Sequence, residues 1–181
     1  PAVDEALRAA MSAAAVKAGE AIAYAGAGTV EFLLTAEGEF FFLEVNTRLQ
    51  VEHPVTELVY GVDLVELQLR VAAGEPVPDP PAPHGWAVEA RLYAEDAANG
   101  FLPVTGTLER FRIDGDVRVD TGVQDGSQIT PYYDPMLAKV VAHGPTREAA
   151  ARKLADALAR AHLHGSVTNR DFLVRVLGHE E

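Results

Sequence analysis

The sequence contains no cysteine, which excludes disulfides, thiolate metal sites and cysteine nucleophiles. It has no run of 18 apolar residues and no charged segment followed by an apolar leader, so it predicts neither a membrane span nor an export signal. Basic residues are scarce, with 15 Lys and Arg against 27 Asp and Glu, which argues against nucleic acid and anionic membranes as partners. These absences favour a cytoplasmic protein.

The chain has enough apolar residues to form a hydrophobic core. The 181 residues are 48% hydrophobic, which suffices for one domain or two small ones. The first residue is proline rather than methionine, and the chain opens directly into a helix-like pattern. We therefore expect a fragment of a longer polypeptide.

Two β-rich runs, 30–35 and 39–46, flank the segment Ala36-Glu37-Gly38 and predict a β-hairpin. A two-residue turn at Glu37-Gly38 would fix the pairing of the strands. One face of the hairpin then carries Val30, Phe32, Leu34, Phe41, Leu43 and Val45. The other face carries Leu33, Phe40 and Phe42 near the turn and polar residues at the far end.

This register places Glu31 directly opposite Glu44, and Thr29 opposite Asn46. Two like charges opposed on a sheet cost roughly 0.2–1 kcal/mol of stability. A divalent cation between them would reverse that sign, and carboxylate and amide oxygens suit Mg²⁺ or Mn²⁺. The alternative is a turn one residue longer, which would move the two Glu residues to opposite faces.

Polar residues crowd the segment that follows the hairpin. Residues 44–57 read Glu-Val-Asn-Thr-Arg-Leu-Gln-Val-Glu-His-Pro-Val-Thr-Glu. A polar end on an otherwise apolar hairpin indicates a site for cations and small anions. The planar guanidinium of Arg48 suits a small oxyanion.

These residues resemble the C-terminal half of a biotin carboxylase, the ATP-grasp component of the biotin-dependent acyl-CoA carboxylases. The pattern of Glu31, Glu44 and Asn46 alone is similar to ATP-grasp enzymes in general, and the continuation through 48–54 narrows the resemblance to biotin-linked members. Further similar segments cover nearly the whole chain: His84–Arg91, Ala94–Asp96, Gly100–Pro103, Pro131–Lys139 and Thr168–Leu173.

The resemblance implies an ATP- and bicarbonate-dependent ligase that carboxylates carrier-linked biotin through a carboxyphosphate. Such chemistry needs metal ions that bridge the phosphates and neutralise developing charge, here two Mg²⁺ or Mn²⁺ ions. The metal ligands that the resemblance implies are Glu31, Glu44 and Asn46.

The bicarbonate site that the resemblance implies consists of Arg48, Gln50 and the backbone N–H of Val51. Glu52 matches the general base, and a neighbouring Arg favours the ionised carboxylate that a base requires. The alternative for Arg48 and Glu52, which are four residues apart, is a surface ion pair contributing about 0.3–0.5 kcal/mol.

For the biotin step, the resemblance implies Arg91 as the residue that stabilises the enolate-like ureido oxygen. Its alternative is a structural ion pair with Glu89 or Glu95. Asp134, in the loop Pro131–Pro135, is a weaker candidate for the border of the biotin site. That loop is equally explained as a rigid turn whose tyrosines pack on the core, and we favour the turn. His53 precedes Pro54 and is expected to be a packed or capping residue.

The resemblance also marks what is missing from the chain. The N-terminal domain, the glycine-rich lid and the phosphate-binding lysines of the family lie upstream, and no biotin attachment sequence is present. The chain alone is therefore expected to be inactive. The expected partners are a biotin carrier domain, a carboxyltransferase subunit that decides the acyl-CoA, and a second copy of the chain. Two alternatives stay open: another ATP-grasp ligase, such as a carbamoyl-phosphate-forming enzyme, and a non-catalytic assembly module.

The pattern predicts an α+β fold with three parts: a helix plus an antiparallel hairpin in residues 1–75, a proline-rich connector at 76–83, and a C-terminal domain of β-sheet and helices at 84–181. The resemblance implies that residues 1–75 are the C-terminal part of an ATP-grasp domain and that residues 84–181 are the biotin carboxylase C-terminal domain. Helices are predicted at 3–23, from Pro54 to Gly61, at 64–73 behind the cap Asp63, from Thr146 to about 161, and behind the cap Thr168 with Asp171. Strands are predicted at 85–94, 107–113, 117–120 and 136–142.

Overall fold

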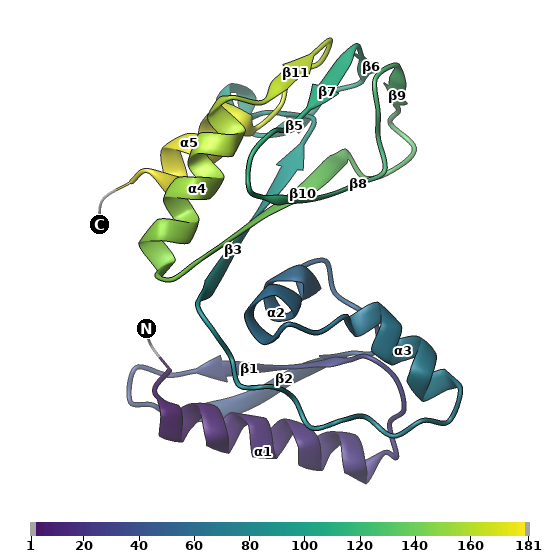
Figure 1. The fold of residues 1–181 in the computed structure, drawn as a ribbon, viewed down its shortest axis with the longest axis vertical. Helices are drawn as coiled ribbons and strands as arrows, with labels where there is room; N and C mark the ends of the chain where they lie inside the picture. Colours follow the sequence, from purple (N-terminus) through teal and green to yellow (C-terminus); the bar gives the residue numbers. More distant parts are fainter. Residues whose placement is uncertain (1–2, 180–181) are drawn as a thin grey trace. The chain divides into compact units, whose positions relative to one another are not determined.

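The computed structural model describes residues 3–179, and its elements are drawn in Figure 1. The helices are α1 (Glu5–Ala21), α2 (His53–Tyr60), α3 (Leu64–Ala72), η1 (Ala97–Asn99), α4 (Arg147–Ala159) and α5 (Arg170–Leu177). The strands are β1 (Thr29–Leu34), β2 (Phe40–Asn46), β3 (Trp86–Tyr93), β4 (Glu95–Asp96), β5 (Leu102–Pro103), β6 (Gly106–Leu108), β7 (Arg110–Arg112), β8 (Arg118–Thr121), β9 (Ser127–Ile129), β10 (Met136–Gly144) and β11 (His162–His164).

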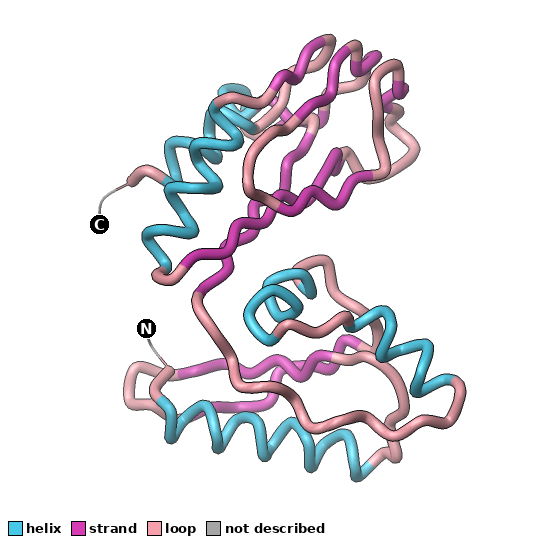
Figure 2. Tube along the Cα trace, in the orientation of Figure 1, coloured by secondary structure: helices cyan, strands magenta, loops and turns pink. Residues whose placement is uncertain are grey.

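The chain folds into two compact units. The first contains the residues up to His53 together with Asp63–Pro80, and the second contains Pro54–Val62 together with the chain from Pro81 onward. Helix α2 therefore belongs to the second unit although it lies within the first part of the sequence. The predicted α+β class is confirmed, with a helix and an antiparallel hairpin in the first unit and antiparallel strands with helices in the second (Figure 2).

In the first unit, α1 contacts β1 of the hairpin (Figure 1). The helix begins where the Oδ1 of Asp4 accepts a hydrogen bond of 2.8 Å from the N–H of Leu7, a regular N-cap. It ends at Ala21, two residues before the predicted end and well before Gly26. The left-handed φ of 50° at Ala23 stops the helix first.

The hairpin corrects the predicted turn. Thr35 and Glu39 close the loop through the hydrogen bond from the N–H of Thr35 to the oxygen of Glu39, so the loop has three residues rather than two. Near the turn Phe32 pairs with Phe42, not with Leu43. Phe40 and Phe42 therefore share the face of Phe32, and the predicted faces of Phe40, Phe41 and Phe42 were wrong. The rings of Phe32 and Phe40 stack edge to face at 5.3 Å.

A β-bulge restores the predicted pairing at the other end of the hairpin. The register shifts between Glu31 and Phe32, so that Leu43 is the extra residue on β2. Beyond the bulge Glu31 pairs with Glu44, and Thr29 pairs with Asn46. The opposed glutamates were thus predicted correctly from a turn that was wrong, because two one-residue shifts cancel.

The helices that follow the hairpin agree with the sequence pattern. Helix α3 begins at Leu64 behind its N-cap Asp63, whose Oδ1 accepts a hydrogen bond of 2.8 Å from the N–H of Glu66. Gly61, with φ of 66°, follows α2 directly. Residues 75–84 form neither helix nor strand, as their five prolines predict.

The second unit is built on a three-stranded antiparallel sheet in the order β3-β10-β8, so β10 is central. Helix α4 packs on this sheet, and α5 packs against α4 and β3 (Figure 2). Thr146 caps α4 as predicted, through a hydrogen bond from the N–H of Ala149. The fully buried side chains of the core include Leu92, Leu108, Val140, Leu154 and Leu158.

Three short two-stranded pairs complete the second unit: β4 with β5, β6 with β9, and β7 with β11. Strands β4, β5, β9 and β11 were not predicted, because two or three residues carry too little periodicity. Gly165, directly after β11, lies against the backbone between β6 and β7. Its φ is 92°, and a Cβ there would lie 2.2 Å from the carbonyl oxygen of Thr107.

Two further predictions are corrected here. The N-cap of α5 is Asn169 rather than Thr168. Tyr132 and Tyr133 are 85% and 83% exposed, so they do not pack on the core.

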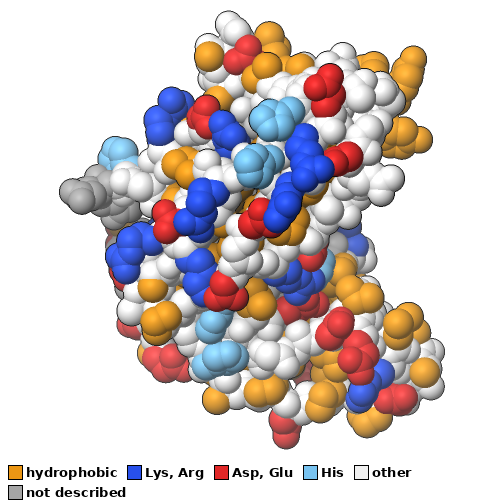
Figure 3. All heavy atoms as spheres, turned by 45° about the horizontal axis from the view of Figure 1, so that its top comes forward, with side chains coloured by type: hydrophobic (Ala, Val, Ile, Leu, Met, Phe, Trp, Pro, Cys, Tyr) orange, Lys and Arg blue, Asp and Glu red, His pale blue; other side chains and the backbone are white. Residues whose placement is uncertain are grey.

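Charged side chains of the second unit are paired rather than gathered by sign. The Nη1 of Arg110 lies 2.8 Å from the Oδ2 of Asp125, and the Nε of Arg112 lies 2.7 Å from the Oδ2 of Asp114. On the face drawn in Figure 3, basic and acidic side chains are interspersed. Within residues 3–179, no helix has the length and apolar character that crossing a membrane requires.

Candidate metal, bicarbonate and biotin site

The opposed glutamates of the hairpin are joined by one side-chain amide. The Nδ2 of Asn46 donates to the Oε1 of Glu31 at 2.7 Å and to the Oε1 of Glu44 at 3.3 Å. Gln50, from the loop after β2, also donates from its Nε2 to the Oε1 of Glu31 at 3.3 Å. The amide groups thereby offset the repulsion of two carboxylates that the register holds side by side.

Arg48 lies next to this group. Its Nη2 donates to the Oδ1 of Asn46 at 3.3 Å, and its Nη1 donates to the carbonyl oxygen of Leu49 at 3.3 Å. The side chain is exposed, so the guanidinium can also bind an anion from solvent. The structure therefore brings together Glu31, Glu44, Asn46, Arg48 and Gln50 in one network of hydrogen bonds.

The donor set fits a hard divalent cation. Carboxylate and amide oxygens are the ligands that Mg²⁺ and Mn²⁺ prefer. Binding would require the amide of Asn46 to rotate by half a turn, so that Oδ1 rather than Nδ2 faces the carboxylates. Within the described residues, no group of three or more His, Asp or Glu side chains is placed to hold a metal, and the amide of Asn46 would be the third protein ligand of a cation between the two glutamates.

The loop that carries the remaining predicted residues is a tight turn. The N–H of His53 donates to the carbonyl oxygen of Gln50 at 3.4 Å, which places Val51 and Glu52 at the centre of the turn. The Nδ1 of His53, the first residue of α2, lies 2.6 Å from the same oxygen, so its imidazole contacts the turn that precedes the helix. Glu52 is exposed and Val51 is partly exposed.

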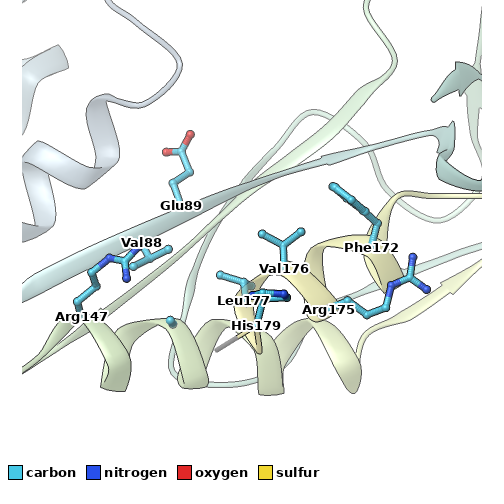
Figure 4. A pocket seen from close by; sticks show the side chains of 9 residues that line it. Val88, Glu89, Arg147, Phe172, Arg175, Val176, Leu177 and His179 are labelled. Atoms are coloured by element: carbon cyan, nitrogen blue, oxygen red, sulfur yellow. The ribbon is translucent and has the colours of Figure 1, made fainter. Parts of the chain in front are cut away.

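Arg91 belongs to the second unit and lies on β3. It pairs with Lys139 of β10, which pairs in turn with Asp120 of β8, so all three side chains share one face of the sheet. Glu89 lies on the same face, with Oε1 3.9 Å from the Nε of Arg91. Figure 4 shows Glu89 and Val88 pointing to opposite sides of β3, and Val88 lines a pocket of about 830 Å³ beside α4 and α5.

A chain of charges crosses the polar face of this sheet. Glu57 of α2, only 6% exposed, lies 2.5 Å from the Nη1 of Arg118. Arg118 holds Asp120 in two hydrogen bonds of 2.8 and 2.9 Å, and Lys139 lies 3.4 Å from Asp120. The bonds from Arg118 lower the pKa of Asp120 below its usual value, and Lys139 contributes in the same direction.

Asp134, the weaker biotin candidate, serves the loop that contains it. Its Oδ1 accepts a hydrogen bond of 2.9 Å from the N–H of Met136 at the start of β10. Burial raises the pKa of Glu95, and the charge of Asp134 raises it further. The structure thus ties Asp134 to the local turn and places it close to a second carboxylate.

Sequence reasoning missed two residues of this region, Lys139 and Asn169. Lys139 follows from strand register, which a sequence shows only weakly. Its signal was a lone cation in the apolar run Met136–Ala142. Asn169 contacts β3 from 76 and 78 residues away. The sequence offered little indication of this role, because an Asn next to Thr168 at the start of a helix looks like an ordinary N-cap residue.

The chain matches two known family descriptions. Residues 89–181 match "Biotin carboxylase C-terminal domain", and residues 1–79 match "Carbamoyl-phosphate synthase L chain, ATP binding domain". Among curated proteins, it is 46% identical to the mitochondrial methylcrotonoyl-CoA carboxylase subunit alpha of Rattus norvegicus, over 100% of this chain and 26% of the rat protein. It is 47% identical to the propionyl-CoA carboxylase alpha chain of Ruegeria pomeroyi, over 99% of this chain and 30% of that protein.

Solved structures give the same result. The biotin carboxylase domain dimer of the Hydrogenobacter thermophilus 2-oxoglutarate carboxylase, in complex with MgADP, ADP and bicarbonate, is 37% identical. It superposes with a TM-score of 0.94 over 99% of this chain and 41% of that chain. The Kluyveromyces lactis urea carboxylase is 43% identical, with a TM-score of 0.94 over 99% of this chain and 16% of that chain.

The fold and the matched descriptions define a piece of an ATP-grasp protein that includes the C-terminal end of its nucleotide-binding domain. The chain belongs to the biotin carboxylase family and corresponds to the C-terminal half of such a component. It spans between a quarter and a third of the length of the curated relatives described above.

If the two glutamates bind a divalent cation, Glu44→Gln should have opposite effects on stability in the absence and in the presence of that cation. Without metal, Glu44→Gln is expected to raise the stability of the 181-residue chain by roughly 0.2–1 kcal/mol, because it removes one of two opposed charges. With Mg²⁺ at ten times its dissociation constant, the unchanged chain gains about 1.4 kcal/mol, and the variant gains little. Thermal unfolding with and without MgCl₂ measures both, with the exposed Glu39→Gln as the control. A Glu44→Gln variant that keeps the full Mg²⁺ response contradicts the site.

Proposed function

We propose that the full-length protein that carries this chain carboxylates carrier-linked biotin, using ATP and bicarbonate through a carboxyphosphate. The observation that supports this most directly is the network of Glu31, Glu44 and Asn46, which is continuous through Arg48 and Gln50 with the turn that carries Glu52. One short segment thus presents oxygen ligands for cations, a guanidinium for an anion and a carboxylate for a proton.

Each residue would have one task in that reaction. Glu31, Glu44 and Asn46 would hold Mg²⁺ or Mn²⁺, two ions in all, which when bound neutralise the charge that develops on the phosphates of ATP. Arg48, Gln50 and the N–H of Val51 would orient bicarbonate. Glu52 would accept the bicarbonate proton as the bicarbonate oxygen attacks the terminal phosphorus and ADP leaves.

Arg91 would serve the second half of the reaction. When the ureido nitrogen of biotin loses its proton, negative charge develops on the ureido oxygen, and a guanidinium stabilises it. Lys139 shares the face of Arg91 and adds a second positive charge there. Asp134 is a weaker candidate for the same site, since its side chain already bonds the main chain of Met136.

The assembly around this chain is part of the proposal. We propose a biotin carrier domain and a carboxyltransferase subunit as partners, because several relatives are named as subunits of acyl-CoA carboxylases. A homodimer is proposed because a similar biotin carboxylase domain is described as a dimer. The domain division at the connector 76–83 and the cytoplasm as the compartment are likewise proposals. Some relatives are mitochondrial by name.

The test compares bicarbonate-dependent ATP cleavage by the full-length protein and by the 181-residue chain, with and without free biotin. We expect activity only in the full-length protein, and we expect biotin to accelerate it. Activity that ignores biotin would favour the other ATP-grasp ligases, such as the carbamoyl-phosphate-forming enzymes, whose ATP-binding domain the first 79 residues also match. No ATP cleavage by the full-length protein would favour a non-catalytic module. Turnover by the chain alone would show that the upstream residues are not required.

A further inference from the structure

Asn169 occupies the N-cap position of α5, yet its side chain makes no hydrogen bond to the helix. A capping Asn normally stabilises a helix by about 0.5–2 kcal/mol through its side-chain oxygen. Here only Thr168 assists the helix start, through a hydrogen bond of 3.4 Å from the N–H of Arg170. The side chain of Asn169 is used for another purpose.

The side chain of Asn169 instead forms hydrogen bonds to the main chain at the outer edge of β3. The N–H of Tyr93 donates to the Oδ1 of Asn169 at 2.9 Å, and the Nδ2 of Asn169 donates to the carbonyl oxygen of Arg91 at 3.2 Å. The main-chain N–H of Asn169 also donates to the carbonyl oxygen of Tyr93 at 3.1 Å. Strand β3 is at the edge of its sheet, so this buried residue, 6% exposed, provides the bonds that a neighbouring strand would make.

These bonds fix the main chain at Arg91, which the hydrogen bonds of the sheet do not reach. The N–H and C=O of a strand residue point to the same side, so both main-chain groups of Arg91 face Asn169 rather than β10. Its pair with Lys139 is therefore of the kind without ladder hydrogen bonds between the two residues. The backbone that carries the Arg91 guanidinium is fixed from outside the sheet by one amide side chain.

We propose that Asn169 is a positioning residue for Arg91. By bonding the carbonyl of Arg91 and the N–H of Tyr93, it sets the position from which the guanidinium reaches the ureido oxygen of biotin. This inference rests on the proposed function, in which Arg91 acts on biotin. A displacement of about 1 Å at such a group can lower a rate by about 100-fold.

The test uses the full-length protein with Asn169→Asp and Asn169→Ser. In Asn169→Asp, the group that faces the carbonyl of Arg91 becomes an acceptor, so the bond turns into a repulsion, whereas Asn169→Ser is shorter and keeps at most one of the two bonds. We expect the kcat/KM for free biotin to fall about 10- to 100-fold, with Asn169→Asp the larger effect. We expect the slow bicarbonate-dependent ATP cleavage without biotin, and the KM values for ATP and bicarbonate, to change less than twofold.

Thr168→Ala is the matched control, because it removes the hydroxyl that bonds the N–H of Arg170 at the start of α5, and it should leave the kcat/KM for biotin unchanged. Arg91→Ala is the reference for the proposed function. If Arg91→Ala leaves the biotin step intact, the role of Arg91 itself is wrong. If Arg91→Ala impairs that step and both Asn169 variants do not, the positioning role is wrong. Equal losses with and without biotin in the Asn169 variants would make Asn169 merely structural and overturn the inference. Should Asn169→Asp not fold, Asn169→Ser decides, and it should add nothing in an Arg91→Ala background.

Discussion

Replacing Glu52 with Gln is expected to lower the kcat of bicarbonate-dependent ATP cleavage by the full-length protein about 10²- to 10⁴-fold, the usual contribution of a positioned general base. Gln has the same shape and can still form hydrogen bonds, but it cannot accept the bicarbonate proton. Since Glu52 lies exposed at the centre of the turn from Gln50 to His53, its replacement removes no buried packing. The thermal midpoint should therefore stay within about 1 °C of the unchanged protein.

Glu39→Gln is the matched control for this experiment, since Glu39 is an exposed carboxylate in the loop of the preceding hairpin. It should change kcat less than twofold. The two candidate roles of Glu52 are separated by comparison with Arg48→Ala. A surface ion pair would give a small stability loss of about 0.3–0.5 kcal/mol in either variant and no loss of kcat. Activity of Glu52→Gln within threefold of the unchanged protein would rule out the base.

The hairpin shows what a sequence can predict about such a site and for what reason. Alternation along two strands was sufficient to bring Glu31 opposite Glu44, since both residues lie within one local element. The length of the loop and the bulge at Leu43 were not predicted, because each changes the register by a single residue. The two changes are opposite in sign, so the pairing of Glu31 with Glu44 was correct all the same. The polar residues that follow β2 were found because they stand in one continuous segment of the chain.

The second unit shows the limit of the same reasoning. Helix and strand patterns predicted β3, β8, β10 and α4. They contained no information on which strands are neighbours, so the pairing of Arg91 with Lys139 was not predicted. The contact between Glu57 and Arg118 joins residues 61 positions apart, and each looks like an ordinary surface charge in sequence. Glu57 is buried in a helix, α2, that belongs to the second unit, and the sequence did not indicate that α2 belongs there.

This ion pair gives the largest stability prediction. Arg118→Met is expected to destabilise the 181-residue chain by about 3 kcal/mol, the lower end of the usual cost of removing one partner from a buried ion pair, because the Arg118 side chain is itself 33% exposed. Glu57 is only 6% exposed, and Arg118 also makes two hydrogen bonds to Asp120. Met has a similar length, so the loss reflects the charge rather than a cavity. Urea unfolding measures the difference.

Arg112→Met is the matched control, because Arg112 makes an ion pair with Asp114 in which both side chains are more than half exposed. Such exposed pairs contribute at most about 1 kcal/mol. Two outcomes contradict the interpretation: equal losses in both variants, or a loss below about 1 kcal/mol in Arg118→Met.

The dependence on pH tests the part of this network that titrates. Arg118 lowers the pKa of Asp120, so its contribution is fully present above the unfolded-state value of about 3.9 and is lost as pH falls through the lower folded-state pKa. The stability difference between the unchanged chain and Arg118→Met should therefore be constant between about pH 5 and 7 and shrink as pH falls below about 4. A difference that stays constant as pH falls below about 4 would mean that Arg118 stabilises the fold by packing and not through the carboxylates that it contacts.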